Sequence, residues 1–103
     1  MRVELHPEAR AELRAAAIWY DERRPGLGDE FIAEGSSMLD KIGEVPASFQ
    51  IWPGTSPASR SIRRAVVNRF PYVIAFEVHS EHTLVLAIAH AKRRPLYWLT
   101  RAF

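Results

Sequence analysis

Apolar residues recur in the first part of the chain at the spacing of an α-helix. From Ala9 to Tyr20 they stand three or four positions apart, and charged residues fall between them. This period places the apolar side chains on one face of a helix. Pro7 suits a first helical turn because its missing N–H has no acceptor there, and Glu8 favours the positive end of the helix dipole. The pattern predicts an amphipathic helix that begins just after His6.

A break and a second helical stripe follow. Pro25, Gly26 and Gly28 interrupt the first pattern, since proline and glycines so close together end a helix and turn the chain. From about Asp29 to Pro46 apolar residues again share one stripe, with Phe31, Gly35, Met38 and Ile42 at its centre. We expect the two helices to form an antiparallel hairpin.

Four other stretches have the composition of β-strands. Arg2 to Leu5 alternates polar and apolar residues, and residues 62–67, 72–78 and 83–89 are rich in apolar and β-branched types. The run 84–89 is continuously apolar, which favours a strand inside the sheet. Residues 46–61 have the prolines and serines of a loop, which Phe49, Ile51 and Trp52 would pin to the body. The apolar residues 96–99 should dock back on the core.

The order β-α-α-β-β-β predicts an α+β fold, with an antiparallel or mixed sheet and the helical hairpin packed on one face. The opposite face of the sheet is expected to stay open. A length of 103 residues without a repeat or a linker predicts one domain, 1–103.

Charge divides unevenly along the chain. Residues 1–50 hold six Lys/Arg and ten Asp/Glu, whereas residues 51–103 hold eight and two. Such a split indicates two surfaces with different partners. The chain has no cysteine, so a disulfide framework and thiolate metal sites are excluded. The N-terminus lacks a signal-peptide pattern and no apolar run approaches the ~20 residues of a membrane span, so we expect a cytoplasmic protein without membrane contact.

Common catalytic signatures are missing from the sequence. It contains neither a glycine-rich phosphate loop nor a GxSxG motif, and its four histidines are not spaced as a metal site, apart from His79 and His82 in an expected hairpin turn. We therefore predict no cofactor and no metal. What remains is a basic cluster, in which arginine forks would bind phosphate. Its arginines are Arg60, Arg63, Arg64, Arg69, Arg93, Arg94 and Arg101. Tyr97 and Trp98 could stack on bases, although such residues are more often part of the core.

Two further interpretations of these residues stay open. The arginines could instead keep strand edges soluble and pair with the acidic helices. His90 ends an apolar strand beside three cations, and an imidazole suits proton transfer near neutral pH, but a histidine that caps a strand through backbone hydrogen bonds is equally common.

Three segments together resemble the RelE/ParE superfamily of bacterial toxins. The resemblance covers nearly the whole chain and implies a βααβββ fold and a cognate antitoxin, encoded alongside, that wraps and neutralises the toxin. The matching residues are His6 to Leu13 with Trp19, Tyr20 and Pro25 to Phe31; then Arg63, Arg64, Arg69, Phe70, Pro71 and Tyr72; and last Ala87 to His90, Arg93 to Pro95, Tyr97, Trp98 and Arg101.

The superfamily divides at mechanism. RelE-like members cut mRNA on the ribosome, and in that case Arg64 and Arg93 or Arg94 would clamp the phosphate while the catalytic proton carriers would be His90 or Tyr97. ParE-like members inhibit DNA gyrase without chemistry of their own and serve in plasmid stabilisation.

This sequence is more similar to the ParE branch. Its opening carries Trp19 and Tyr20, its tail carries a tryptophan, and it lacks the lysine-rich strand of the nucleases, since Lys41 and Lys92 are its two lysines. The resemblance thus favours a gyrase inhibitor, with a ribosome-dependent mRNA endonuclease as the alternative and an inactive, antitoxin-binding relative as a third possibility. Whether the protein is an enzyme stays open at this point.

Overall fold

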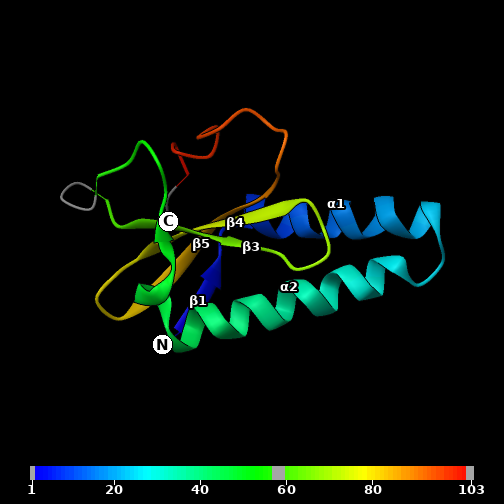
Figure 1. The fold of residues 1–103 in the computed structure, drawn as a ribbon, viewed down its shortest axis with the longest axis horizontal. Helices are drawn as coiled ribbons and strands as arrows, with labels where there is room; N and C mark the ends of the chain where they lie inside the picture. Colours follow the sequence, from blue (N-terminus) through cyan, green and yellow to red (C-terminus); the bar gives the residue numbers. More distant parts are fainter. Residues whose placement is uncertain (1, 57–59, 102–103) are drawn as a thin grey trace.

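Two helices and five strands make up the chain, which a computed structural model describes at residues 2–56 and 60–101 (Figure 1). Strand β1 (Arg2–Leu5) leads directly into helix α1 (Pro7–Arg23), and helix α2 (Leu27–Glu44) returns alongside it. A short 3-10 turn follows, and then four strands, one more than the sequence pattern predicts. They are β2 (Gln50–Ile51), β3 (Ile62–Val66), β4 (Tyr72–Val78) and β5 (His82–His90).

Local chemistry explains where the helices begin. The Nδ1 atom of His6 accepts a hydrogen bond from the Glu8 N–H at 3.0 Å, which caps α1 ahead of Pro7. Between the helices Gly26 has a φ of 89°, a left-handed conformation that glycine adopts without strain. Helix α2 therefore begins at Leu27, two residues before the predicted start. Gly28 is buried against α1, and its N–H donates to Oδ1 of Asp21 at 2.7 Å.

The strands form one mixed sheet in the order β1-β5-β4-β3-β2. Strand β1 runs parallel to β5, and every other neighbouring pair is antiparallel. The prediction that the last strand lies inside the sheet is confirmed, because β5 is flanked by β1 and β4. The segment predicted as a loop contains β2, whose residues Gln50 and Ile51 pair with Arg64 and Arg63. Two residues are too few to show an alternating pattern in a sequence.

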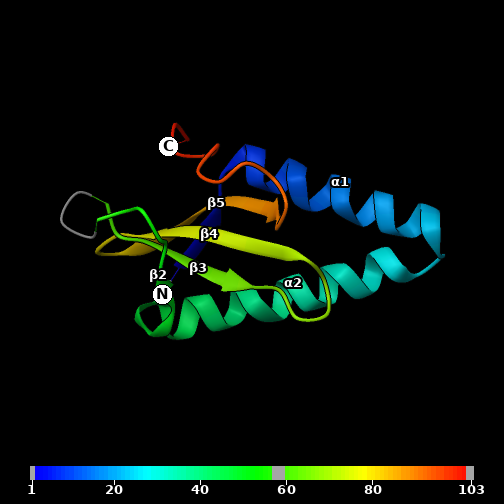
Figure 2. The same cartoon turned by 45° about the horizontal axis from the view of Figure 1, so that its top comes forward.

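Both faces of the sheet are covered. The helices pack on one face, where Phe31 and Ile42 meet Ile74, Phe76 and Val85 of the central strands. The expectation of an open opposite face is wrong, because the C-terminal tail after β5 folds back across it (Figure 2). Trp98, only 1% exposed, is the centre of this second core, which also contains Ile62, Ala75, Leu84, Leu86, Ala87 and Ala89. The predicted docking of residues 96–99 is thus confirmed.

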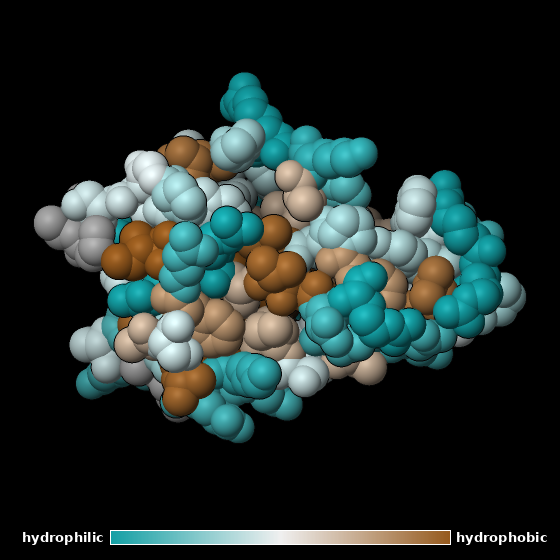
Figure 3. All heavy atoms as spheres, viewed as in Figure 1, coloured by the Kyte–Doolittle hydropathy of each residue, from teal (hydrophilic) through white to brown (hydrophobic). Residues whose placement is uncertain are grey.

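The surface is mixed in character. Hydrophilic side chains gather over the far end of the helical hairpin, whereas polar and apolar side chains are interspersed over the sheet (Figure 3). The exposed large apolar residues include Ile18 and Trp19 on α1 and Val66 on β3. Neither helix has an apolar stretch long enough to span a bilayer among the residues that the structure describes.

Candidate functional site

A shielded carboxylate on α1 anchors the C-terminal tail. The two oxygens of Glu12 accept hydrogen bonds from the hydroxyl of Tyr97 at 2.6 Å and from both terminal nitrogens of Arg101 at 2.9 and 3.1 Å. Arg93 approaches the same carboxylate at 3.4 Å. The side chains of Glu12 and Arg101 are only 14% and 13% exposed, so this ion pair is largely removed from water. One residue of the first helix therefore binds three residues of the tail and helps to hold the tail against the sheet.

The same pair completes the backbone hydrogen bonding of the sheet edge. Strand β1 ends at Leu5, opposite Val85, and the second half of β5 has no neighbouring strand on that side. There the Ile88 N–H donates to Glu12 at 3.0 Å, and the Leu86 carbonyl accepts from Arg101 at 3.0 Å. Leu86 is the residue that the β4–β5 register skips. Side chains thus satisfy backbone groups that another strand would otherwise pair.

Titration behaviour follows from this burial. Burial, the hydrogen bond to Glu12 and the charge of Glu12 together raise the pKa of Tyr97 well above its ordinary value. Burial also has the largest influence on Arg101 and opposes its charge, but the hydrogen bonds and charge of Glu12 outweigh burial and raise the pKa of Arg101. Tyr97 is accordingly a neutral phenol whose hydroxyl donates a hydrogen bond to Glu12.

Beside this anchor the tail face has a groove of about 280 Å³, which we call the basic groove. Segments far apart in the sequence form it: strand β3, the loop after β2, the end of β5 and the turn that follows β5. Its main lining residues are Arg64, Trp52, His90, Arg93, Arg94 and Tyr97.

Aromatic rings support two of the arginines in the basic groove. The guanidinium of Arg93 lies 3.8 Å from the centre of the Tyr97 ring, and that of Arg64 lies 5.5 Å from the Trp52 ring. Neither Arg64 nor Arg94 has a hydrogen bond or an ion pair within residues 2–56 and 60–101, and the Nε atom of Arg64 is shielded from water. The groove therefore contains guanidinium groups that retain donors for a ligand.

His90 is held in a defined orientation at the end of β5. Its ring packs edge-on against Tyr72, with centroids 5.2 Å apart, and its Nδ1 accepts the backbone N–H of Lys92 at 3.1 Å. In the neutral tautomer that makes this bond, the proton is on Nε2. His90 can therefore offer a hydrogen-bond donor to the groove. Its hydrogen bond with the Lys92 N–H also gives His90 the second role considered from the sequence, that of a histidine that caps the end of a strand.

The other predicted arginines lie outside the basic groove and are already bonded. Arg60 forms a bidentate ion pair with Glu77, with nitrogen–oxygen distances of 2.7 and 3.1 Å. Arg63 donates a hydrogen bond to the Phe49 carbonyl at 2.6 Å. Arg101 belongs to the anchor described above.

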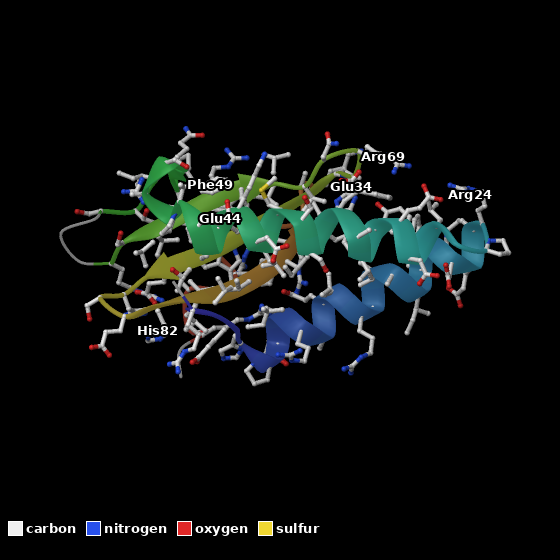
Figure 4. All side chains as sticks on the ribbon, turned by 90° about the horizontal axis from the view of Figure 1, so that it is seen from below. Arg24, Glu34, Glu44, Phe49, Arg69 and His82 are labelled. Atoms are coloured by element: carbon white, nitrogen blue, oxygen red, sulfur yellow. The ribbon has the colours of Figure 1, made fainter. Side chains whose placement is uncertain are left out.

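Arg69, at the β3–β4 turn, reaches across to α2 instead. It bonds Glu30 at 2.8 Å and lies 3.6 Å from Glu34. Figure 4 shows Arg69 and Glu34 near each other in the view with α2 in front. Of the seven predicted arginines, the structure thus brings together Arg64, Arg93 and Arg94, and it places His90 and Tyr97 beside them. Trp98 lies in the core, which confirms the structural interpretation of this residue and excludes stacking on bases.

A second, more apolar groove of about 730 Å³ adjoins the basic groove between α1 and the sheet. Trp19, Tyr20, Pro71 and Tyr72 form its apolar walls, and His90 and Arg93 belong to both grooves. Trp19 is 49% exposed. Sequence reasoning missed this groove and also Glu12, which resembles any other carboxylate on the helix. The one sequence signal for this groove is that Trp19, a large apolar residue, falls outside the apolar stripe of α1.

No group of three or more His, Asp or Glu side chains with the geometry of a metal site occurs among the described residues. The histidines of the β4–β5 turn, His79 and His82, stack on each other with centroids 4.9 Å apart. His79 also lies 3.4 Å from Glu77, a carboxylate that is already bonded to Arg60.

Fold and grooves together define a small α+β protein with a surface suited to binding, in which a basic and an apolar groove meet. Residues 3–95 match the family model described as the ParE toxin of the type II toxin-antitoxin system parDE. The chain belongs to this family.

A solved structure supports the same fold. The chain is similar to a protein described as the chromosomal ParDE TA system from P. aeruginosa, with 18% identity and a TM-score of 0.75 over 89% of this chain and 97% of that one. The predicted α+β fold is confirmed by this likeness. No curated protein matches the sequence.

Proposed function

We propose that this protein is a toxin that inhibits DNA gyrase by binding and is neutralised by a cognate antitoxin. Membership of the ParE toxin family supports the toxin class. The observation that supports inhibition by binding, rather than by catalysis, is the protonation of Tyr97. Its hydroxyl donates a hydrogen bond to Glu12 at 2.6 Å, and its pKa is raised. A part-buried, neutral phenol whose hydroxyl already donates a hydrogen bond is poorly suited to act as a base. The basic groove is thus better suited to hold a target than to cleave one.

The runner-up is a ribosome-dependent mRNA endonuclease. One observation favours it, namely that Arg64, Arg93 and Arg94 line the same groove as His90. In such a reaction the arginines would stabilise charge on the phosphate at the cleavage point, and His90 would donate a proton through Nε2.

The decisive experiment compares the two targets in parallel. Purified gyrase is assayed for supercoiling with and without the protein, beside a reconstituted translation reaction in which mRNA cleavage is measured. We expect loss of supercoiling with intact mRNA. Codon-spaced cuts in the mRNA with normal supercoiling would establish the endonuclease instead, and no effect in either assay would indicate an inactive relative.

Variants of the basic groove connect this activity to the site. Arg64→Ala and Arg93→Ala should each abolish the toxic effect, because both remove a cation from the groove. Arg14→Ala removes the same charge from an exposed position of α1 outside both grooves and should leave the effect intact. Full toxicity of both groove variants would contradict the assignment of the target site to this surface.

We assign the antitoxin to the apolar groove. An exposed tryptophan with apolar walls beside it suits the apolar face of a peptide segment, and such aromatic anchors carry much of the binding energy in interfaces. Trp19→Ala should weaken binding of the product of the neighbouring gene by at least about tenfold. Ile18→Ala, which removes an equally exposed residue outside the groove, is the matched control and should change the affinity little.

A further inference from the structure

The arginines of this protein fall into two groups according to their neighbours. Arg60, Arg69 and Arg101 each have a carboxylate oxygen within 2.7 to 2.9 Å. In contrast, the described residues that line the basic groove include neither Asp nor Glu, and two of its three arginines, Arg64 and Arg94, have no ion pair there. The third, Arg93, lies 3.4 Å from Glu12, a carboxylate that is also bonded to Arg101. A concave surface with cations that no carboxylate neutralises attracts anions. The groove is thus distinguished from the rest of the basic surface by its free charge.

The donors of the groove suit a phosphate group. A guanidinium is a planar fork that can bond two phosphate oxygens at once. The Nε atom of Arg64 is shielded from water and has no acceptor among the described residues, so this donor is available for an anion that enters the groove. Arg94 is exposed beside it, and the Nε2 of His90 supplies a further donor.

Size and ring contacts limit what else the groove can bind. Its volume of about 280 Å³ is slightly below the roughly 300–1,000 Å³ of typical ligand pockets, which suits one phosphate and its sugar better than a large cofactor. The aromatic rings are already in use: Trp98 is buried, the Tyr97 ring lies under Arg93, and Trp52 packs on Trp98 at 4.9 Å. They support the arginines and leave little free surface for stacking on a base.

We infer that the basic groove binds the phosphodiester backbone of a nucleic acid without base-specific contacts. This inference deepens the proposed function and rests on it, since it names the chemical group that the groove of the toxin contacts at its target. Contact through phosphates alone gives binding that is independent of sequence and falls steeply with salt.

The test measures binding by the purified protein without gyrase, so that it can fail separately from gyrase inhibition. Fluorescence anisotropy follows a labelled single-stranded DNA, a DNA of scrambled sequence and an RNA of the same sequence across a range of salt concentrations. We expect equal affinity for the two DNAs. Arg94→Gln should lower the affinity about tenfold and reduce the salt slope by about 0.7, the value for one phosphate contact to a single strand. Arg94 is exposed and unpaired among the described residues, so this variant should fold normally.

Arg64→Gln should have a similar effect, and Arg14→Gln, with the same loss of charge on α1, should have none. A preference for DNA or for RNA would support the inference and identify the source of the backbone. Three results would overturn it. The first is no binding at low salt, and the second is an equal loss of affinity in Arg14→Gln and Arg94→Gln. The third is that a mononucleotide, compared at equal phosphate concentration, competes as well as the oligonucleotide. The last result would indicate a site for free phosphate compounds.

Discussion

Removal of the Glu12 carboxylate should destabilise the fold strongly. The substitution Glu12→Ala leaves the guanidinium of Arg101, the hydroxyl of Tyr97 and the N–H of Ile88 without their acceptor. Loss of one partner from a buried ion pair costs about 3–5 kcal/mol. Since Glu12 is 14% exposed, water can partly replace it, and we expect the lower end, about 3 kcal/mol. For a domain of this size, each kcal/mol lowers Tm by roughly 4–8 °C, so the expected decrease is about 12–24 °C.

Thermal and urea unfolding followed by circular dichroism measure this change. Glu12→Gln keeps the size of the side chain and one acceptor oxygen, and should cost about 2 kcal/mol, near the strength of one hydrogen bond to a charged group. Glu22→Gln removes the same charge from an exposed position of the same helix, where the Arg23 contact is 3.6 Å long, and should change stability by less than about 0.5 kcal/mol. A loss below about 1 kcal/mol in Glu12→Ala would refute the role of this carboxylate as the anchor of the tail.

Further predictions concern pH and helix packing. The hydrogen bonds from Arg60 hold the pKa of Glu77 below its usual value, so its contribution to stability is present above the unfolded pKa of about 4.3 and is lost as the pH falls through the folded pKa. Glu77→Gln should therefore flatten the decrease of Tm in acid. Burial raises the pKa of all three tyrosines, and for Tyr97 the stabilisation is present below the unfolded pKa of about 10 and lost as the pH rises further. Ultraviolet titration should find tyrosinate at pH 10 in urea but little in the folded protein, and equal curves would contradict this. Gly28→Ala would place a Cβ atom 2.3 Å from a backbone oxygen of α1 and should cost about 1–3 kcal/mol, whereas Gly35→Ala meets ordinary contacts and should stabilise α2 by up to about 1 kcal/mol.

The local elements were predictable because their signals are local. Helix α1 is visible in the spacing of its apolar residues and in Pro7 and Glu8 at its start, all within a few positions of one another. The interior strand β5 is visible as a continuous apolar run. Strand β2 was missed because two residues carry no period, and their pairing with β3 depends on the return of the chain after a long loop.

The candidate site was only partly predictable for the opposite reason. The sequence identifies every arginine that lines the basic groove, but it does not distinguish Arg64 and Arg94, which have no partner among the described residues, from the arginines that meet a carboxylate. Arg60 meets a carboxylate 17 positions away, and Arg101 meets one 89 positions away. A sequence pattern gives the charge of each residue but not its distance from a partner so remote along the chain.

By itself, then, the sequence determined the order of helices and strands, the apolar faces that pack together and the excess of cations in the second half of the chain. These follow from the periods of helix and strand and from composition. Only the tertiary structure decided that the tail covers the second face of the sheet and that Arg64, Arg93 and Arg94 meet in one groove. The physical reason is that both features depend on contacts between residues far apart in the sequence, such as those of Glu12 with Arg101 and Tyr97 and the packing of Trp98 on the sheet.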